Sequence, residues 1–167
     1  MTDTVQQLID AMQQELQFQQ DLAALLDHKL DAMRHYDISR MEALGISEQR
    51  LVDRLRSHEQ QRTEAIRRAT RQYFPARFRQ VATCREIAQV IAEPSRSKLL
   101  TLAAMLKDVA QNVQRLHRVQ TLASRKIMAH FNQIFRIIAQ SGRDVGLYGR
   151  GGKKALLEQN RLVDALA

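Results

Sequence analysis

The sequence predicts an all-α protein whose long antiparallel helices form a helical hairpin or a three-helix bundle with coiled-coil-like packing. Hydrophobic residues make up 44% of the 167 residues, whereas only 6 Gly and 2 Pro are present to form turns. Apolar side chains recur in steps of three and four over long stretches, which is the spacing of one face of a helix. The length of the chain fits one domain and allows a sizeable core.

The first predicted helix covers residues 3–35. Its apolar stripe follows alternating steps of four and three: Val5, Ile9, Met12, Leu16, Gln19, Ala23, Leu26, Leu30 and Met33. Asp37 follows this helix and is the candidate N-cap of the next one, because its carboxylate can accept a hydrogen bond from a free amide of the first turn. We therefore expect a short turn between two antiparallel helices.

The second predicted helix covers residues 38–73. Its first half places four apolar side chains on one face: Met41, Leu44, Leu51 and Leu55. The same seam then continues through smaller or more polar residues: His58, Arg62, Ala69 and Tyr73. We therefore expect the far end of this helix to be poorly buried. Pro75 ends the helix, because proline disfavours helical geometry in the residue before it.

A short third helix is predicted over residues 84–92. Thr83 and Glu86 have the spacing of a capping box, in which each side chain satisfies a free backbone amide at the start of a helix. Pro94 interrupts this helix after about two turns.

The last predicted helix covers residues 96–140 and is the best-defined element of the chain. Its stripe is long enough to pack along another helix over its whole length: Leu99, Leu102, Leu106, Val109, Val113, Leu116, Gln120, Ala123, Ile127, Phe131, Ile134 and Ile138. Ser141 and Gly142 are expected to end it.

The composition changes after this helix, which divides the chain into a helical bundle over residues 1–141 and a tail over residues 142–167. The tail begins with a Gly-rich basic linker, which we expect to be flexible. A short amphipathic segment follows, with five apolar side chains: Leu156, Leu157, Leu162, Val163 and Leu166. So short a helix is marginal on its own in water, but a partner could fold it.

The sequence shows no catalytic or metal-binding pattern, and we predict that the chain is not an enzyme, binds no metal and needs no cofactor. His28 and His35 lie seven residues apart, which is not a metal-ligand motif. The run from Gly149 to Lys154 lacks the spacing of a phosphate-binding P-loop. Cys84 lacks the neighbouring base that a nucleophile needs, and is expected to be structural.

The N-terminal residues, the length of the apolar runs and the net charge indicate where the protein is located and what kind of partner it binds. Residues 1–15 carry no basic cluster ahead of an apolar run, so no secretory signal is indicated. The longest apolar stretch, residues 99–106, is far short of the roughly 20 residues of a membrane span, and we expect a cytoplasmic protein without membrane insertion. A net charge of +8 favours an anionic partner, although the basic residues can also form a solvated face.

Two regions resemble flagellar export chaperones of the FlgN type. Between residues 22 and 62, closely spaced leucines precede a charged residue. An Asp follows at the helix boundary, and a series of apolar and Glu residues then ends in Arg. The residues of this pattern are Leu22, Leu25, Leu26, Asp27, Asp37, Met41, Leu44, Glu48, Leu51, Leu55, Glu59 and Arg62. After the long helix, the run Leu147-Tyr148-Gly149-Arg150-Gly151-Gly152 is similar to a tyrosine and glycine stretch of that family.

The resemblance implies a cytoplasmic chaperone that binds the C-terminal amphipathic helices of hook-filament junction proteins, prevents their premature association and delivers them to the flagellar type III export gate. It implies client contacts in the C-terminal part of the chain: Phe131, Ile134, Phe135, Ile138, Leu156, Leu157, Leu162, Val163 and Leu166. It also implies that Tyr148 contacts the export gate. The residues alone leave open that Phe131, Ile134 and Ile138 extend the core, and that Tyr148 is an ordinary loop aromatic.

Two alternatives from other functional classes remain open at this point. A homo-oligomeric coiled-coil scaffold would have the same helical periodicity and would self-associate tightly. A basic helical nucleic-acid-binding protein would account for the charge, although no helix-turn-helix or basic-zipper pattern is present.

Overall fold

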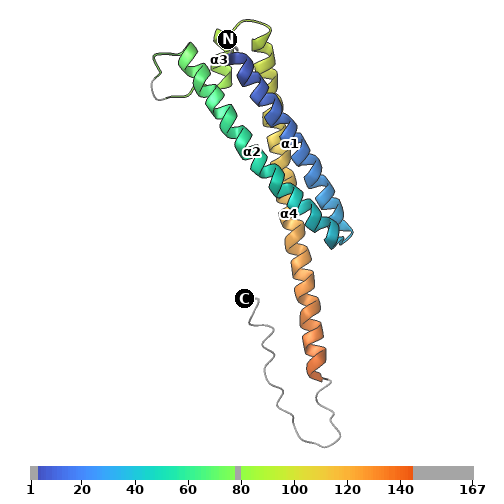
Figure 1. Cartoon of the computed structure of the whole chain (residues 1–167). Coiled ribbons are helices and arrows are strands. Elements are labelled where there is room, and N and C mark those ends of the chain that lie inside the picture. Colours follow the sequence, from blue (N-terminus) through green and yellow to red (C-terminus); the bar gives the residue numbers. More distant parts are fainter. Residues whose placement is uncertain (1–3, 78–79, 145–167) are drawn as a thin grey trace, which may run out of the picture. The chain divides into compact units, whose positions relative to one another are not determined.

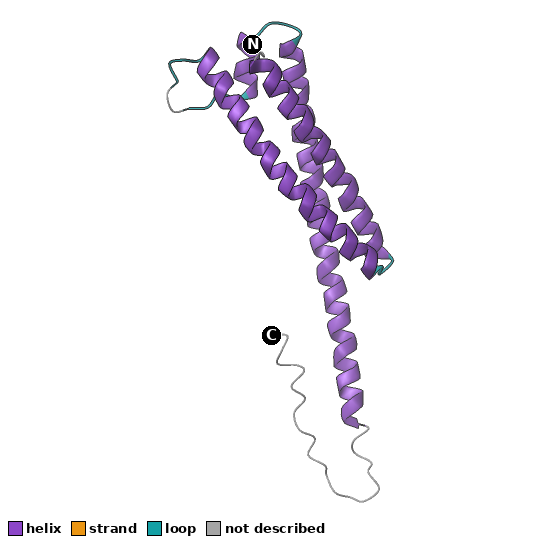
Figure 2. Ribbon diagram, viewed as in Figure 1, coloured by secondary structure: helices purple, strands orange, loops and turns teal. Residues whose placement is uncertain are grey.

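The computed structural model describes residues 4–77 and 80–144, with side chains through Gln140, and these residues form four helices (Figure 1). They are α1 (Thr4–Arg34), α2 (Ile38–Tyr73), α3 (Cys84–Val90) and α4 (Ser95–Asp144). No strand occurs within these ranges, so the predicted all-α fold class is confirmed (Figure 2). The chain divides into two compact units, residues 1–124 and 125–167, and α4 contributes to both.

A tight turn joins α1 to α2 and makes them antiparallel neighbours (Figure 1). The Asp37 amide donates to the Ala32 carbonyl at 3.0 Å and the Tyr36 amide to the Met33 carbonyl at 3.3 Å, which is the pattern of a Schellman motif. Tyr36 has a φ of 52°, a left-handed conformation that this motif usually assigns to glycine. Asp37 then accepts a hydrogen bond from the Arg40 amide at 3.0 Å, so the predicted N-cap of α2 is confirmed.

Two ion pairs fix the register of α1 against α2. Arg62 Nε lies 2.5 Å from Glu15 Oε2, and Lys29 Nζ lies 2.6 Å from Glu48 Oε2. The two pairs are separated by the same number of residues on each helix, from 15 to 29 and from 48 to 62, which is two heptads. Between them the Phe18 and His58 rings lie 4.7 Å apart. The hairpin therefore has the coiled-coil-like packing that the sequence predicted.

The main core of residues 1–124 lies where the start of α1, the end of α2, α3 and the start of α4 meet. It consists of thirteen buried side chains: Val5, Leu8, Ile9, Met12, Leu16, Ala65, Ala69, Ala82, Ile87, Ala88, Ile91, Leu99 and Leu102. The expectation that the far end of α2 is poorly buried is wrong, because Ala65, Ala69 and Thr70 are all buried there. Their small side chains let α1 and the returning segment around Ala82 pack closely against this end.

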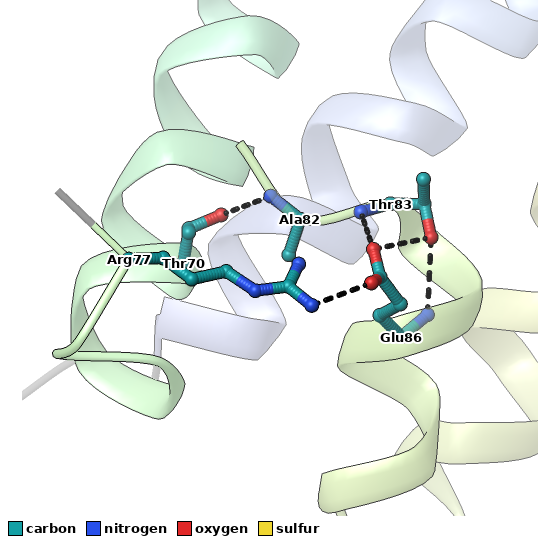
Figure 3. Close-up of polar contacts among 5 residues, drawn as sticks. All are labelled: Thr70, Arg77, Ala82, Thr83 and Glu86. Carbon is teal, nitrogen blue, oxygen red and sulfur yellow. Dashed lines mark hydrogen bonds and ion pairs between the residues drawn. The ribbon is translucent and has the colours of Figure 1, made fainter. Parts of the chain in front are cut away.

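The segment that returns from α2 to α3 is held by a polar network (Figure 3). Thr70 Oγ1 accepts a hydrogen bond from the Ala82 amide at 3.0 Å, and Arg77 Nη2 donates to Glu86 Oε1 at 2.8 Å. Thr83 and Glu86 form the predicted capping box at the start of α3. The hydrogen bond from Arg77 and those from Thr83 lower the pKa of Glu86 to about 2.

Two helix ends differ from the sequence-based expectations. α3 ends at Val90 rather than near residue 92, and the Arg96 guanidinium donates to the carbonyls of Ala88 and Gln89 in its last turn. The long helix does not end at Ser141-Gly142 but continues to Asp144. One glycine inside a helix costs only about 1 kcal/mol, which is too little to terminate a helix by itself. The division at residue 141 stays a prediction, because residues 145–167 lie outside the described ranges.

Candidate protein-binding site

Four of the predicted client-contact residues lie on one face of α4 within the second unit. Phe131, Ile134, Phe135 and Ile138 are spaced at i, i+3, i+4 and i+7, which places them on the same side of a helix. Phe131 is half-buried, whereas Phe135 and Ile138 are 66% and 61% exposed. Large apolar side chains with such exposure at helical spacing form a surface suited to a partner.

This face is wider than the stripe of predicted contact residues. Met128 is 60% exposed, Ile137 is also exposed, and Ile127 is half-buried. At about 100° per residue, Ile127 and Met128 project within the same half of the helix as Phe131 and Ile138, and Ile137 lies beyond its edge, about 120° from Phe131. Met128 and Ile137 lie beside the narrow stripe that predicted the client contacts and were not among them, although the helical spacing of both is visible in the sequence. We call the seven side chains the α4 apolar face: Ile127, Met128, Phe131, Ile134, Phe135, Ile137 and Ile138.

The polar side of the same helix is basic. From Val109 to Arg143 the sequence contains no Asp or Glu, whereas it contains six Arg and Lys residues: Arg115, Arg118, Arg125, Lys126, Arg136 and Arg143. Arg125, Lys126 and Arg136 are exposed, lie about 120–140° around the helix from Phe131, and form no ion pair with a described residue. The side of α4 opposite its apolar face is therefore cationic, and a cationic surface attracts anionic partners.

The described part of the chain offers little for catalysis or metal binding. No group of three or more His, Cys, Asp or Glu side chains within it could hold a metal ion. Burial raises the pKa of the Cys84 thiol, which keeps it protonated and unreactive, and its Sγ lies 4.0 Å from Met12 Sδ. None of the four helices, taken over their described residues, is long and apolar enough to cross a membrane.

The other predicted contact residues lie outside the described ranges. They are the tail residues Leu156, Leu157, Leu162, Val163 and Leu166, and the candidate gate contact Tyr148. Their roles therefore stay predictions.

Comparison with known proteins gives one match. A family model described as FlgN protein matches residues 1–155, which includes all four helices and the glycine-containing stretch after α4. No curated protein and no solved structure matches the chain.

Proposed function

The chain belongs to the FlgN family of flagellar export chaperones, and we propose from this premise that it binds the C-terminal amphipathic helices of hook-filament junction proteins in the cytoplasm. By covering the apolar stripe of such a client, it prevents premature association of the client subunits. It then delivers the client to the flagellar type III export gate.

The observation that carries this proposal is the exposure of the α4 apolar face. An amphipathic client helix with anchors at i, i+3, i+4 and i+7 matches a partner helix that presents the same spacing. Each large apolar side chain buried on binding contributes about 1.5–3 kcal/mol before the cost of ordering the client. Phe135 and Ile138, the most exposed large apolar side chains of this face, are therefore the strongest anchors available among the described residues.

Calorimetric titration with the C-terminal segments of hook-filament junction proteins tests the proposal. We expect one-to-one binding by the full chain and at least about 100-fold weaker binding by the Phe135→Asp/Ile138→Asp variant, because two interface anchors are replaced by charges. Ile46→Asp is the matched control, since Ile46 is also exposed but lies on α2. Equal loss of binding in the control, or unchanged binding by the α4 variant, would show that the α4 apolar face is not the client site.

We propose a separate role for Tyr148 as the contact for the export gate. Tyr148→Ala is expected to leave the affinity for the client segment within about twofold, since Tyr148 is not one of the seven residues that define the α4 apolar face. The same variant should lose binding of the chaperone–client complex to the purified cytoplasmic domain of the gate, whereas Tyr148→Phe tests whether the hydroxyl is needed. Loss of client affinity in Tyr148→Ala would assign this residue to the client site instead.

A further inference from the structure

The sequence of the second unit contains two apolar stripes of similar length. The α4 apolar face runs from Ile127 to Ile138, which is about 16 Å along the helix axis. We call residues 155–167 the tail segment; they lie outside the described ranges, so only their sequence pattern is used. At about 100° and 1.5 Å per residue, a helix over this segment would place four apolar side chains within about one third of its circumference and about 15 Å of its length. These four are Leu156, Leu162, Val163 and Leu166.

The chain between the two stripes is long enough to bring them together. α4 continues to Asp144, about 9 Å beyond Ile138, and the eleven residues 145–155 follow, four of which are Gly. An antiparallel return places residue 156 beside Ile138, about 9 Å back along the axis and about 8–10 Å across, which is a span of about 13 Å. Eleven residues reach at most about 36 Å, and a Gly-rich chain of that length has an average end-to-end distance of about 18 Å. The linker therefore allows an antiparallel return without being stretched.

We propose that the tail segment folds onto the α4 apolar face as an antiparallel helix when no client is bound, and that a client must displace it. This inference rests on the proposed chaperone function and adds a competition at the same site. The stripe of α4 packs against helices in the first unit, where Leu99 and Leu102 join the buried core, so a helix is the element that this stripe accepts elsewhere in the chain. An uncovered face of large apolar side chains favours aggregation, which a covering segment suppresses.

The family match separates the α4 apolar face from the tail segment. The family model matches residues 1–155, which include the whole α4 apolar face but none of the four apolar side chains of the tail stripe. The match therefore does not extend the function of the family to these four side chains. Their role depends on what they can reach, and the α4 apolar face is within reach of the linker.

The contact is expected to be weak. Thirteen residues are too few for a stable helix in water, so docking must also order the tail segment. A peptide that binds with a Kd of about 1 mM, tethered at an effective concentration of about 3 mM, occupies its site in about three quarters of the molecules. A client then meets an open face in the remaining quarter, and its apparent affinity falls about fourfold. So weak a contact is lost before the bundle unfolds in urea, and adds little to the free energy of unfolding.

Removal of the tail segment measures the competition. A chain that ends at Lys154 retains Tyr148 and the linker, and should bind a C-terminal segment of a hook-filament junction protein about fourfold more tightly than the full chain does. Leu162→Asp/Leu166→Asp in the full chain should have the same effect, because it removes the apolar stripe without shortening the chain. The control Arg161→Glu changes the net charge by the same amount on the opposite side of the segment, and should retain the affinity of the full chain. Calorimetric titration measures all four proteins.

A disulfide trap tests the contact itself without a client. Ile134→Cys/Gln159→Cys places two thiols close together in the antiparallel arrangement, because Gln159 lies in the middle of the tail stripe. In the control Arg136→Cys/Gln159→Cys, the α4 thiol is two residues further along and on the opposite side of the helix. Cys84→Ser in both variants removes the only native thiol. A tail that does not dock reaches both α4 positions equally often, whereas docking should make the disulfide form at least about fivefold faster in the first variant. A saturating client segment should reduce this rate to that of the control.

The outcomes distinguish failure of the inference from failure of the proposed function. Equal disulfide rates in the two variants would overturn the inference and leave the proposed client site standing, since no client is present in that experiment. Disulfides that link two chains, and form faster as the protein concentration rises, would assign the face to a second copy instead. Weaker client binding by the truncated chain would make the tail segment a client contact, and unchanged binding would show that it does not compete; either result contradicts the inference. If the trap forms but neither the full nor the truncated chain binds a client segment, the proposed function fails, and the competition fails with it.

Discussion

The apolar stripe of α4 has different surroundings in the two units of the chain. In residues 1–124 the side chains of Leu99 and Leu116 are 0% and 2% exposed, whereas in residues 125–167 those of Ile134 and Ile138 are 37% and 61% exposed. The spacing of the stripe is the same in both. In the first unit α1, α2 and α3 supply side chains that cover the stripe, whereas the described part of the second unit consists of α4 alone. Periodicity therefore predicts which face of a helix is apolar, but not whether that face is covered.

The largest expected effect compares one side chain from each part of the stripe. Leu99→Ala should lower the free energy of unfolding by about 2–5 kcal/mol, because it leaves a cavity in the core. Ile138→Ala should change it by less than about 0.5 kcal/mol, because the side chain is mostly exposed. Urea unfolding followed by circular dichroism measures both. Similar losses in the two variants would show that the α4 apolar face is covered in the free protein.

The contrast between buried and exposed side chains also applies to ion pairs. Arg62→Ala leaves the buried carboxylate of Glu15 without its partner, and should cost about 2–3 kcal/mol of stability. Arg67→Ala removes an exposed pair with Glu64, and should cost less than about 0.5 kcal/mol. If the two variants unfold at the same urea concentration, the Glu15–Arg62 pair does not stabilise the hairpin.

A smaller effect on the free energy of unfolding is expected from Glu86, whose carboxyl group is exposed but has a low pKa. The pKa of Glu86 is lowered from 4.5 to about 2, so the unfolded state binds its proton more readily than the folded state does. Its contribution to stability is therefore present above about pH 4.5 and lost as the pH falls towards 2. Arg77→Ala removes the largest cause of this shift and should make stability fall less steeply over that range. Urea unfolding at a series of pH values measures the slope, and an unchanged slope would contradict the assigned cause.

Local features of the fold were predictable from the sequence. Asp37 caps α2 as expected, and Thr83 and Glu86 form the expected capping box, because both arrangements depend on residues three positions apart. The helical fold class followed from apolar spacing in the same way. Features that depend on contacts between residues distant from each other in the sequence were harder to predict. Ala65 and Ala69 are buried partly because the segment around Ala82 returns over them, which the pattern of α2 alone does not reveal.

The candidate site was predictable in part for the same reason. The sequence placed Phe131, Ile134, Phe135 and Ile138 on one helix, but could not separate a core stripe from an exposed one. Likewise, Arg62 was expected to interrupt the apolar seam of α2, whereas the fold pairs it with Glu15, 47 positions earlier. The basic character of α4 was visible only as net charge until the helix placed Arg125, Lys126 and Arg136 on the side opposite Phe131.

Amide hydrogen exchange of the full chain, with and without a C-terminal segment of a hook-filament junction protein, tests the central claim most directly. We predict that the client segment slows exchange across residues 127–138 and leaves the α1–α2 turn around Tyr36 unchanged. Protection confined to the α1–α2 hairpin, or no change in residues 127–138 when binding is saturated, would contradict the assignment of the α4 apolar face as the client site.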